Sequence, residues 1–142
     1  MRRAGSVVAV ATALTLGSAG QGWASSTSSG DITASWGDRA RIEVTWNDRN
    51  SLRGITLAVA DQTCDERSFY VTLTIQTGAG GILSLGDKHN TGGCGTVAEH
   101  RGVRTTDASG IRRLSMTLCR RAAGMPDHCE TRYITANPYA GL

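Results

Sequence analysis

The most regular feature of the chain is an alternation of apolar and polar residues in short runs. Four segments place an apolar residue at every second position, and these are 42–46, 55–59, 69–75 and 114–118. Side chains on a strand point alternately to the two faces of a sheet, so period two with Thr and β-branched residues indicates strands buried on one face. Weaker runs raise the expected number of strands to seven or eight, and they span 32–36, 83–85 and 132–135.

Turn-forming residues separate these runs at regular intervals. The clusters of Gly, Asn and Asp lie at 37–39, 47–50, 78–81, 90–93 and 107–110, and after residue 24 no segment keeps a helical period for three turns. Many short strands at this spacing predict an all-β fold, an antiparallel immunoglobulin-like β-sandwich of seven to eight strands. Because no Trp lies between two cysteines at antibody spacing, we do not infer membership of the immunoglobulin family itself.

The N-terminus has the layout of a secretory signal peptide. A positive start at 1–3 precedes a mostly apolar, uncharged run at 7–16 and the small-residue pattern Gly22-Trp23-Ala24, which predicts cleavage after Ala24. A retained membrane anchor is the rival interpretation, and the glycines and polar residues at 17–22 interrupt the apolar run that it needs. We therefore expect a signal peptide at 1–24, a flexible leader at 25–30 and a single domain at 31–142.

Length and charge restrict the classes of function. The whole chain has 142 residues, which fits one small domain and excludes a large enzyme. Cleavage after Ala24 removes two arginines and no acidic residue, so the formal charge of +3 falls by two. The pairs Arg112-Arg113 and Arg120-Arg121 direct neighbouring side chains to opposite faces of a strand. Without a clustered basic face we expect no nucleic-acid partner, and no membrane partner once the signal is removed.

Export changes how the four cysteines are interpreted. In a small secreted domain four cysteines normally form two disulfides, and three pairings are conceivable. We favour Cys64 with Cys94 and Cys119 with Cys129, because the latter two flank a Gly- and Pro-containing loop typical of a hairpin. In the chain-entropy model these bridges remove unfolded-state entropy equivalent to about 3.5 and about 2.5 kcal/mol. The spacing lacks the short paired ligands of structural zinc sites, so we expect no metal.

Two tryptophans begin a short internal repeat, Trp-Gly-Asp-Arg at 36–39 and Trp-Asn-Asp-Arg at 46–49. One interpretation makes Trp36 and Trp46 an exposed stacking platform for a sugar or another flat ligand. The other places each indole in the core at the end of a strand, followed by a polar turn. The alternation of strand side chains favours the second interpretation, because Trp36 would lie on the same face as Ile32, and Trp46 on the same face as Ile42.

The sequence offers little for catalysis. There is no Gly-x-Ser-x-Gly elbow, and the three histidines stand in polar, turn-like surroundings. Asp87 and His89 lie in a dense segment, 87–95, that could bind a metal or transfer a proton. A Gly-rich turn pinned by Cys94 is the favoured interpretation. We therefore expect no catalytic residues, no cofactor and no enzymatic activity.

Several short motifs carry a resemblance to a known group. They are Cys64-Asp65, Tyr70 on a Thr-rich strand, Gly92-Gly93-Cys94-Gly95, the hairpin between Cys119 and Cys129, and Asn137-Pro138-Tyr139. With them the chain resembles the small disulfide-stapled β proteins of unknown function that filamentous soil bacteria secrete. The resemblance implies the fold and an extracellular location, and no activity. The subtilisin-inhibitor group and the neocarzinostatin-related apoproteins have different surrounding residues and lend no site residues.

Two functional hypotheses follow. The first is a non-enzymatic extracellular binding or interaction module, a monomer whose end loops contact a protein or a small ligand. The second is an inhibitor of a secreted hydrolase that uses the disulfide-closed loop 120–128. Its contact points would be Arg121, Met125 and Pro126. An ordinary hairpin connection is the simpler interpretation of that loop.

Overall fold

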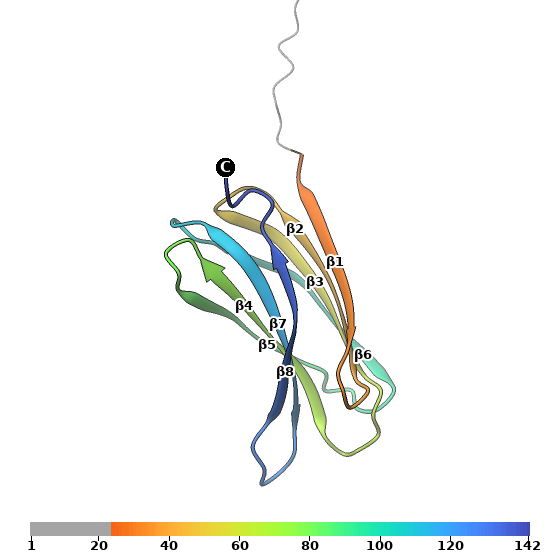
Figure 1. Cartoon of the computed structure of the whole chain (residues 1–142). Helices are drawn as coiled ribbons and strands as arrows, with labels where there is room; N and C mark the ends of the chain where they lie inside the picture. Colours follow the sequence, from red (N-terminus) through yellow and green to blue (C-terminus); the bar gives the residue numbers. More distant parts are fainter. Residues whose placement is uncertain (1–23) are drawn as a thin grey trace, which may run out of the picture.

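The computed structural model describes residues 24–142, and it contains eight antiparallel strands and no helix within that range. One sheet has the order β1-β2-β3-β6 and the other β5-β4-β7-β8, and Figure 1 shows them packed face to face. This is the all-β, sandwich-like fold that the alternating pattern predicts. The strands are β1 (Ser26–Thr33), β2 (Arg39–Trp46), β3 (Ser51–Asp61), β4 (Ser68–Thr77), β5 (Ile82–His89), β6 (Thr96–Thr106), β7 (Ile111–Arg121) and β8 (His128–Ala136).

The core lies between the sheets and is built from the apolar positions of the predicted runs. On β2 every second residue is fully buried, and the residues between them are exposed or partly buried. This is expected for a strand with one face in the core and the other exposed to solvent. β4 contributes Phe69, Val71, Leu73 and Ile75, all with no exposed surface. The interior is therefore formed mainly by β2, β3, β4 and β7, the inner strands of the two sheets.

The beginning of the domain differs from the expectation. Residues 25–30 were expected as a flexible leader, but β1 begins at Ser26 and pairs with β2 along its whole length, from Ser26 opposite Trp46 to Thr33 opposite Arg39. The pairing uses backbone hydrogen bonds, which need no apolar side chains, so Ser, Thr and Gly form an edge strand here. The signal peptide predicted at 1–24 lies outside the described residues except for Ala24.

Both disulfides have the favoured pairing. Cys64 is bonded to Cys94, and Cys119 to Cys129. The first joins the β3–β4 loop to the β5–β6 loop, and the second links directly opposed residues of β7 and β8. Two disulfides are typical of an oxidising, extracellular compartment.

The antiparallel topology sorts the connections between two ends of the sandwich (Figure 1). The loops after β1, β3, β5 and β7 lie at one end, and both disulfides lie at or beside it. We call this the stapled end; it comprises residues 34–38, 62–67, 90–95 and 122–127. The opposite end carries the turns after β2, β4 and β6 and the C-terminal residues. None of the described residues belongs to a helix that could cross a membrane.

Candidate functional site

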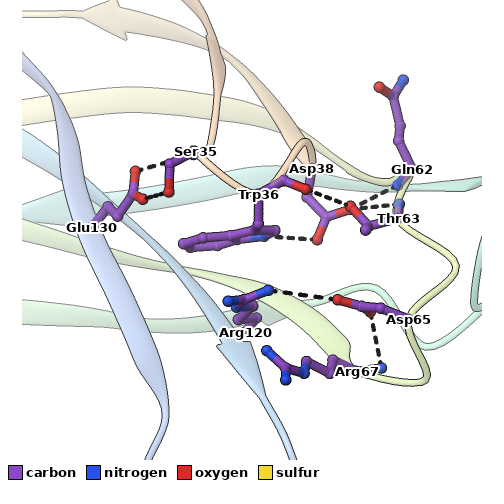
Figure 2. A network of polar contacts seen from close by, with 9 residues as sticks. All are labelled: Ser35, Trp36, Asp38, Gln62, Thr63, Asp65, Arg67, Arg120 and Glu130. Atoms are coloured by element: carbon purple, nitrogen blue, oxygen red, sulfur yellow. Dashed lines mark hydrogen bonds and ion pairs between the residues drawn. The ribbon is translucent and has the colours of Figure 1, made fainter.

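Asp38 holds two loops of the stapled end together. Its side chain is buried, and its Oδ1 accepts hydrogen bonds from the backbone N–H groups of Gln62 and Thr63, both at 2.9 Å, and from the Thr63 hydroxyl at 2.8 Å. Its Oδ2 accepts a hydrogen bond of 2.9 Å from Nε1 of Trp36 (Figure 2). With four donors this buried carboxylate is well satisfied, and it fixes the β1–β2 loop against the β3–β4 loop.

Trp36 lies half-buried in the β1–β2 turn, outside any strand. Its ring meets Phe69 and His128 edge-on, with centroids 6.4 Å and 5.2 Å apart. The guanidinium carbon of Arg120 lies 5.0 Å from the indole centroid, and one Arg120 nitrogen lies 3.7 Å from Asp65 (Figure 2). Trp36 therefore positions Arg120 by a cation–π contact.

The structure does not bring the two tryptophans together. Trp46 is fully buried at the far end of β2, where its Nε1 donates to the Ser28 hydroxyl at 3.3 Å. A platform of Trp36 and Trp46 is therefore wrong: one indole is in the core, and the length of a strand separates it from the other. The expectation that Trp36 ends a strand also fails, because β1 stops at Thr33.

The β1–β2 loop is also tied to β8. Glu130 accepts hydrogen bonds from the backbone N–H of Ser35, at 3.3 Å, and from the Ser35 hydroxyl (Figure 2). It also pairs with Arg132 at 2.8 Å. The Ser35 hydrogen bond is the main reason that the pKa of Glu130 lies below its usual value. Because Glu130 lies on β8 and Ser35 lies in the loop between β1 and β2 of the other sheet, this contact closes one side of the stapled end.

The loop 122–127 has a fixed base and an exposed tip. Asp127 accepts a 2.5 Å hydrogen bond from the Tyr70 hydroxyl and pairs with Arg121 at 3.3 Å. The Tyr70 hydrogen bond, and after it that of Arg121, lowers the pKa of Asp127. Met125 at the tip is 63% exposed, and Pro126 is exposed beside it. Of the three predicted inhibitory contacts, Met125 and Pro126 face solvent, whereas Arg121 is engaged by Asp127.

A concavity of about 390 Å³ lies beside this loop. The charged side chains of its lining are Arg67, Arg120 and Asp127, of which Asp127 is already paired with Arg121, and the apolar part includes Met125 and Pro126. This combination suits a ligand with an anionic group on an apolar body, because guanidinium groups bind carboxylates and phosphates in a bidentate manner.

A larger cavity of about 570 Å³ lies between the β3–β4 and β5–β6 loops, under the Cys64–Cys94 disulfide. Asn90 closes one side: its Nδ2 donates to the carbonyl oxygens of Val59, at 2.9 Å, and Thr96, at 2.8 Å. Asp61 also lines the cavity and is 3% exposed. Its Oδ1 is buried and has no hydrogen-bond partner.

In the segment 87–95, Asp87 and His89 contact different neighbouring residues. Asp87 accepts a 2.7 Å hydrogen bond from the Thr72 hydroxyl, whereas His89 stacks on Tyr70 with centroids 4.8 Å apart. Each side chain thus has a different partner, and the following residues form a loop with positive φ at Gly93 and Gly95. Among residues 24–142, no three His, Cys, Asp or Glu side chains gather closely enough to hold a metal ion.

Sequence reasoning missed Asp61, Arg120 and the contact between Tyr70 and Asp127. Asp61 left a readable signal, because it continues the inward-facing series Ile55, Leu57 and Val59 on β3. Because alternate residues of a strand share a face, the sequence alone shows that Asp61 occupies an inward-facing position where an apolar residue is expected. The other two depend on contacts between residues far apart in the chain.

The fold and the site stand without a recognised relative. No protein-family model, curated protein sequence or solved structure matches the chain significantly.

Proposed function

We propose that this protein is a secreted, non-enzymatic binding module whose stapled end contacts an extracellular ligand. The observation that carries the proposal is the fixation of four loops from both sheets. Asp38, the Ser35–Glu130 contact, the Cys64–Cys94 disulfide and the Tyr70–Asp127 hydrogen bond each tie one of these loops to another element.

Such fixation favours binding because the loops are ordered before a ligand arrives. Ordering loops and side chains at the moment of association lowers affinity, and rigid scaffolds avoid that loss. Arg67 of the fixed β3–β4 loop and Arg120 near the end of β7 lie around the same concavity as the exposed Met125, so this surface combines charge with apolar area. Concavities of about 490 Å³ also occur at the opposite end, one between the β2–β3 turn and Leu142 and the other along the ends of β3 and β6.

Export is part of the proposal. The signal-like pattern at 1–24 and the two disulfides support it. Mass spectrometry of the protein released by an expressing bacterium should find a first residue of Ser25 and no free thiol. Retention of residues 1–24 in the cell membrane would contradict export.

A selection experiment tests the binding surface. Peptides from a random phage-displayed library should be selected on the immobilised, disulfide-intact protein and measured again on two matched variants. Met125 and Leu142 are exposed apolar residues at opposite ends, 63% and 69% exposed. We expect Met125→Ser to weaken the selected peptides and Leu142→Ser to leave them unchanged. Failure to select any peptide, or the reverse pattern of sensitivity, would contradict the proposal.

The exposed tip of the 122–127 loop favours inhibition of a secreted protease as a second function. The tip projects from a hairpin whose strands the Cys119–Cys129 disulfide joins. Because Arg121 is held by Asp127, Met125 and Pro126 are the natural contacts, which points to proteases that prefer apolar residues. A subtilisin-like protease should lose activity with micromolar protein and regain it when Met125→Gly replaces the wild type. Unchanged cleavage with the wild-type protein would rule inhibition out.

A further inference from the structure

Among residues 24–142, two buried side-chain atoms lack a hydrogen-bond partner, Oδ1 of Asp61 and Nε of Arg120. The Arg120 guanidinium still pairs with Asp65 through another nitrogen, whereas Asp61 forms no ion pair within these residues. Asp38 accepts four hydrogen bonds, and both polar atoms of the Asn90 amide are engaged. Asp61 is equally buried, yet its Oδ1 has no hydrogen-bond partner within residues 24–142. An unpaired buried carboxylate is unfavourable in the free protein, which calls for a functional explanation.

The surroundings of Asp61 add negative charge. Burial raises the pKa of the carboxyl, the charges of Asp38 and then Asp65 raise it further, and a backbone hydrogen bond from Thr63 offsets only part of this rise. Glu66 stands on the rim of the same cavity and is exposed. An incoming positive charge would relieve these repulsions and satisfy the orphan oxygen.

Two residues that can carry positive charge also line the cavity. His89 is occupied by its stack on Tyr70. Arg67 lies between the two concavities of the stapled end and lines both. In Figure 2 its side chain extends toward Arg120, a residue that lines the smaller concavity. Arg67 therefore leaves the carboxyl of Asp61 without an ion-pair partner.

We propose that the cavity of about 570 Å³ binds an organic cation, the ammonium or guanidinium end of a lysine or arginine side chain, with the carboxyl group of Asp61 as the acceptor. This inference rests on the proposed function, since it assigns a ligand chemistry to the stapled end. The Cys64–Cys94 disulfide lines the cavity and supplies apolar surface for the methylene stem of the ligand. A bare metal ion fits less well, because calcium takes about six to eight oxygen ligands at roughly 2.3–2.6 Å.

Small probes test this directly. The disulfide-intact protein, labelled with ¹⁵N, should be titrated at neutral pH with N-acetyl-lysine amide, with N-acetyl-arginine amide and with the uncharged N-acetyl-norleucine amide. We expect the two cations to shift the backbone resonances of residues 61–68 and 89–96, and the norleucine probe to shift neither group. Loss of a charge-assisted hydrogen bond to a buried group should weaken the cations about tenfold or more in Asp61→Asn.

Glu66→Gln is the matched control, because it removes the same charge from the exposed rim of the same cavity. We expect it to weaken the cations by less than about threefold, since exposed charges are screened by water. Equal binding to the wild type and Asp61→Asn, or shifts confined to other residues, would overturn the inference. Calcium alone shifting the same resonances at lower concentration than either cation would also overturn it. Peptides that depend on Met125 would support the proposed function even if the cation probes fail to bind, so the two failures are distinguishable.

Discussion

At the scale of single residues, two buried aspartates of the stapled end contrast sharply. Asp38 accepts hydrogen bonds from three residues, whereas Asp61 Oδ1 has no partner, although both side chains are nearly inaccessible. Asp38 stabilises the loops, whereas Asp61 is a carboxyl group whose Oδ1 is buried without a compensating hydrogen bond. Proteins commonly retain such unfavourable groups where function requires them.

Asp61→Asn is expected to stabilise the protein at neutral pH. Because burial, Asp38 and Asp65 raise the native pKa of Asp61 above 3.8, its contribution to stability is present below the unfolded pKa and is lost as pH rises through the native value. The amide does not ionise. The variant should therefore gain on the order of 1 kcal/mol in unfolding free energy near pH 7 and little near pH 3. Urea unfolding at both pH values measures this.

Asp38→Asn is the control for that substitution. Its amide loses acceptor capacity toward Gln62, Thr63 and Trp36, so we expect the unfolding free energy to fall near pH 7. A loss of stability in both variants at pH 7 would show that Asp61 is paired in solution.

Asn90 is the second residue whose burial leads to a prediction. Asn90→Ala would leave the carbonyl oxygens of Val59 and Thr96 without their side-chain donor, and we expect a loss of about 3 kcal/mol. Asn50 also donates to two carbonyl oxygens, those of Asp107 and Ala108, but is exposed. Asn50→Ala should lose about 1 kcal/mol or less, because water replaces its hydrogen bonds. Equal losses in denaturant unfolding would contradict the role assigned to burial.

At the scale of elements, the turns at the opposite end pack tightly against each other. Gly78, after β4, donates a 2.7 Å backbone hydrogen bond to Gly110, after β6. A Cβ at Gly78 would overlap the carbonyl oxygen of Ser109. The hydrogen bond continues the pairing of β4 with β7, in which Thr77 lies opposite Ile111, into the turns that follow β4 and precede β7.

Gly78→Ala should destabilise the protein by about 1–3 kcal/mol, the range for overpacked sites. Gly54 on β3 has no atom within 4 Å of its Cβ direction and no positive φ. Gly54→Ala should be neutral to slightly stabilising, because alanine loses less backbone entropy on folding. Thermal unfolding of both variants decides the matter, and a harmless Gly78→Ala would show that the turns are not in contact.

The disulfides act on different elements, so their removal should have different consequences. Cys64→Ser with Cys94→Ser separates two loops and should lower the unfolding free energy by about 3.5 kcal/mol. Cys119→Ser with Cys129→Ser leaves two strands that are already paired by backbone hydrogen bonds, and about 2.5 kcal/mol is expected. Hydrogen exchange should rise at 90–95 only in the first variant. Faster exchange there in the second would contradict this division.

At the scale of the whole molecule, the sequence predicts the sheet faces better than the site. Alternation identifies the core on β2, β3, β4 and β7 because each such side chain meets a generic apolar interior. β1 was missed at its start because Ser and Thr pair through the backbone alone. Trp36 was assigned to a strand by parity, yet its position is set by Asp38 and Arg120, which no local pattern contains.

The candidate site depends on contacts across the sandwich, and this limits what its sequence reveals. Both disulfides and the loop 122–127 were predictable from cysteine spacing and turn residues. Asp127 instead binds Tyr70, which lies 57 positions earlier, and Glu130 binds Ser35 from the other sheet. The pattern of a single sequence shows the period of apolar residues and the spacing of cysteines and turns. The Tyr70–Asp127 and Ser35–Glu130 contacts depend instead on how the strands and sheets pack together.

The role proposed for Asp61 is to provide an unpaired carboxylate at the stapled end that binds a cationic ligand. Thermal unfolding of the wild type and Asp61→Asn at neutral pH, each with and without saturating N-acetyl-arginine amide, tests it most directly. We predict that the variant unfolds at a higher temperature than the wild type without the probe, and that the probe raises the unfolding temperature of the wild type alone. A probe that stabilises both proteins equally or neither, or a variant that unfolds earlier than the wild type, would contradict the account.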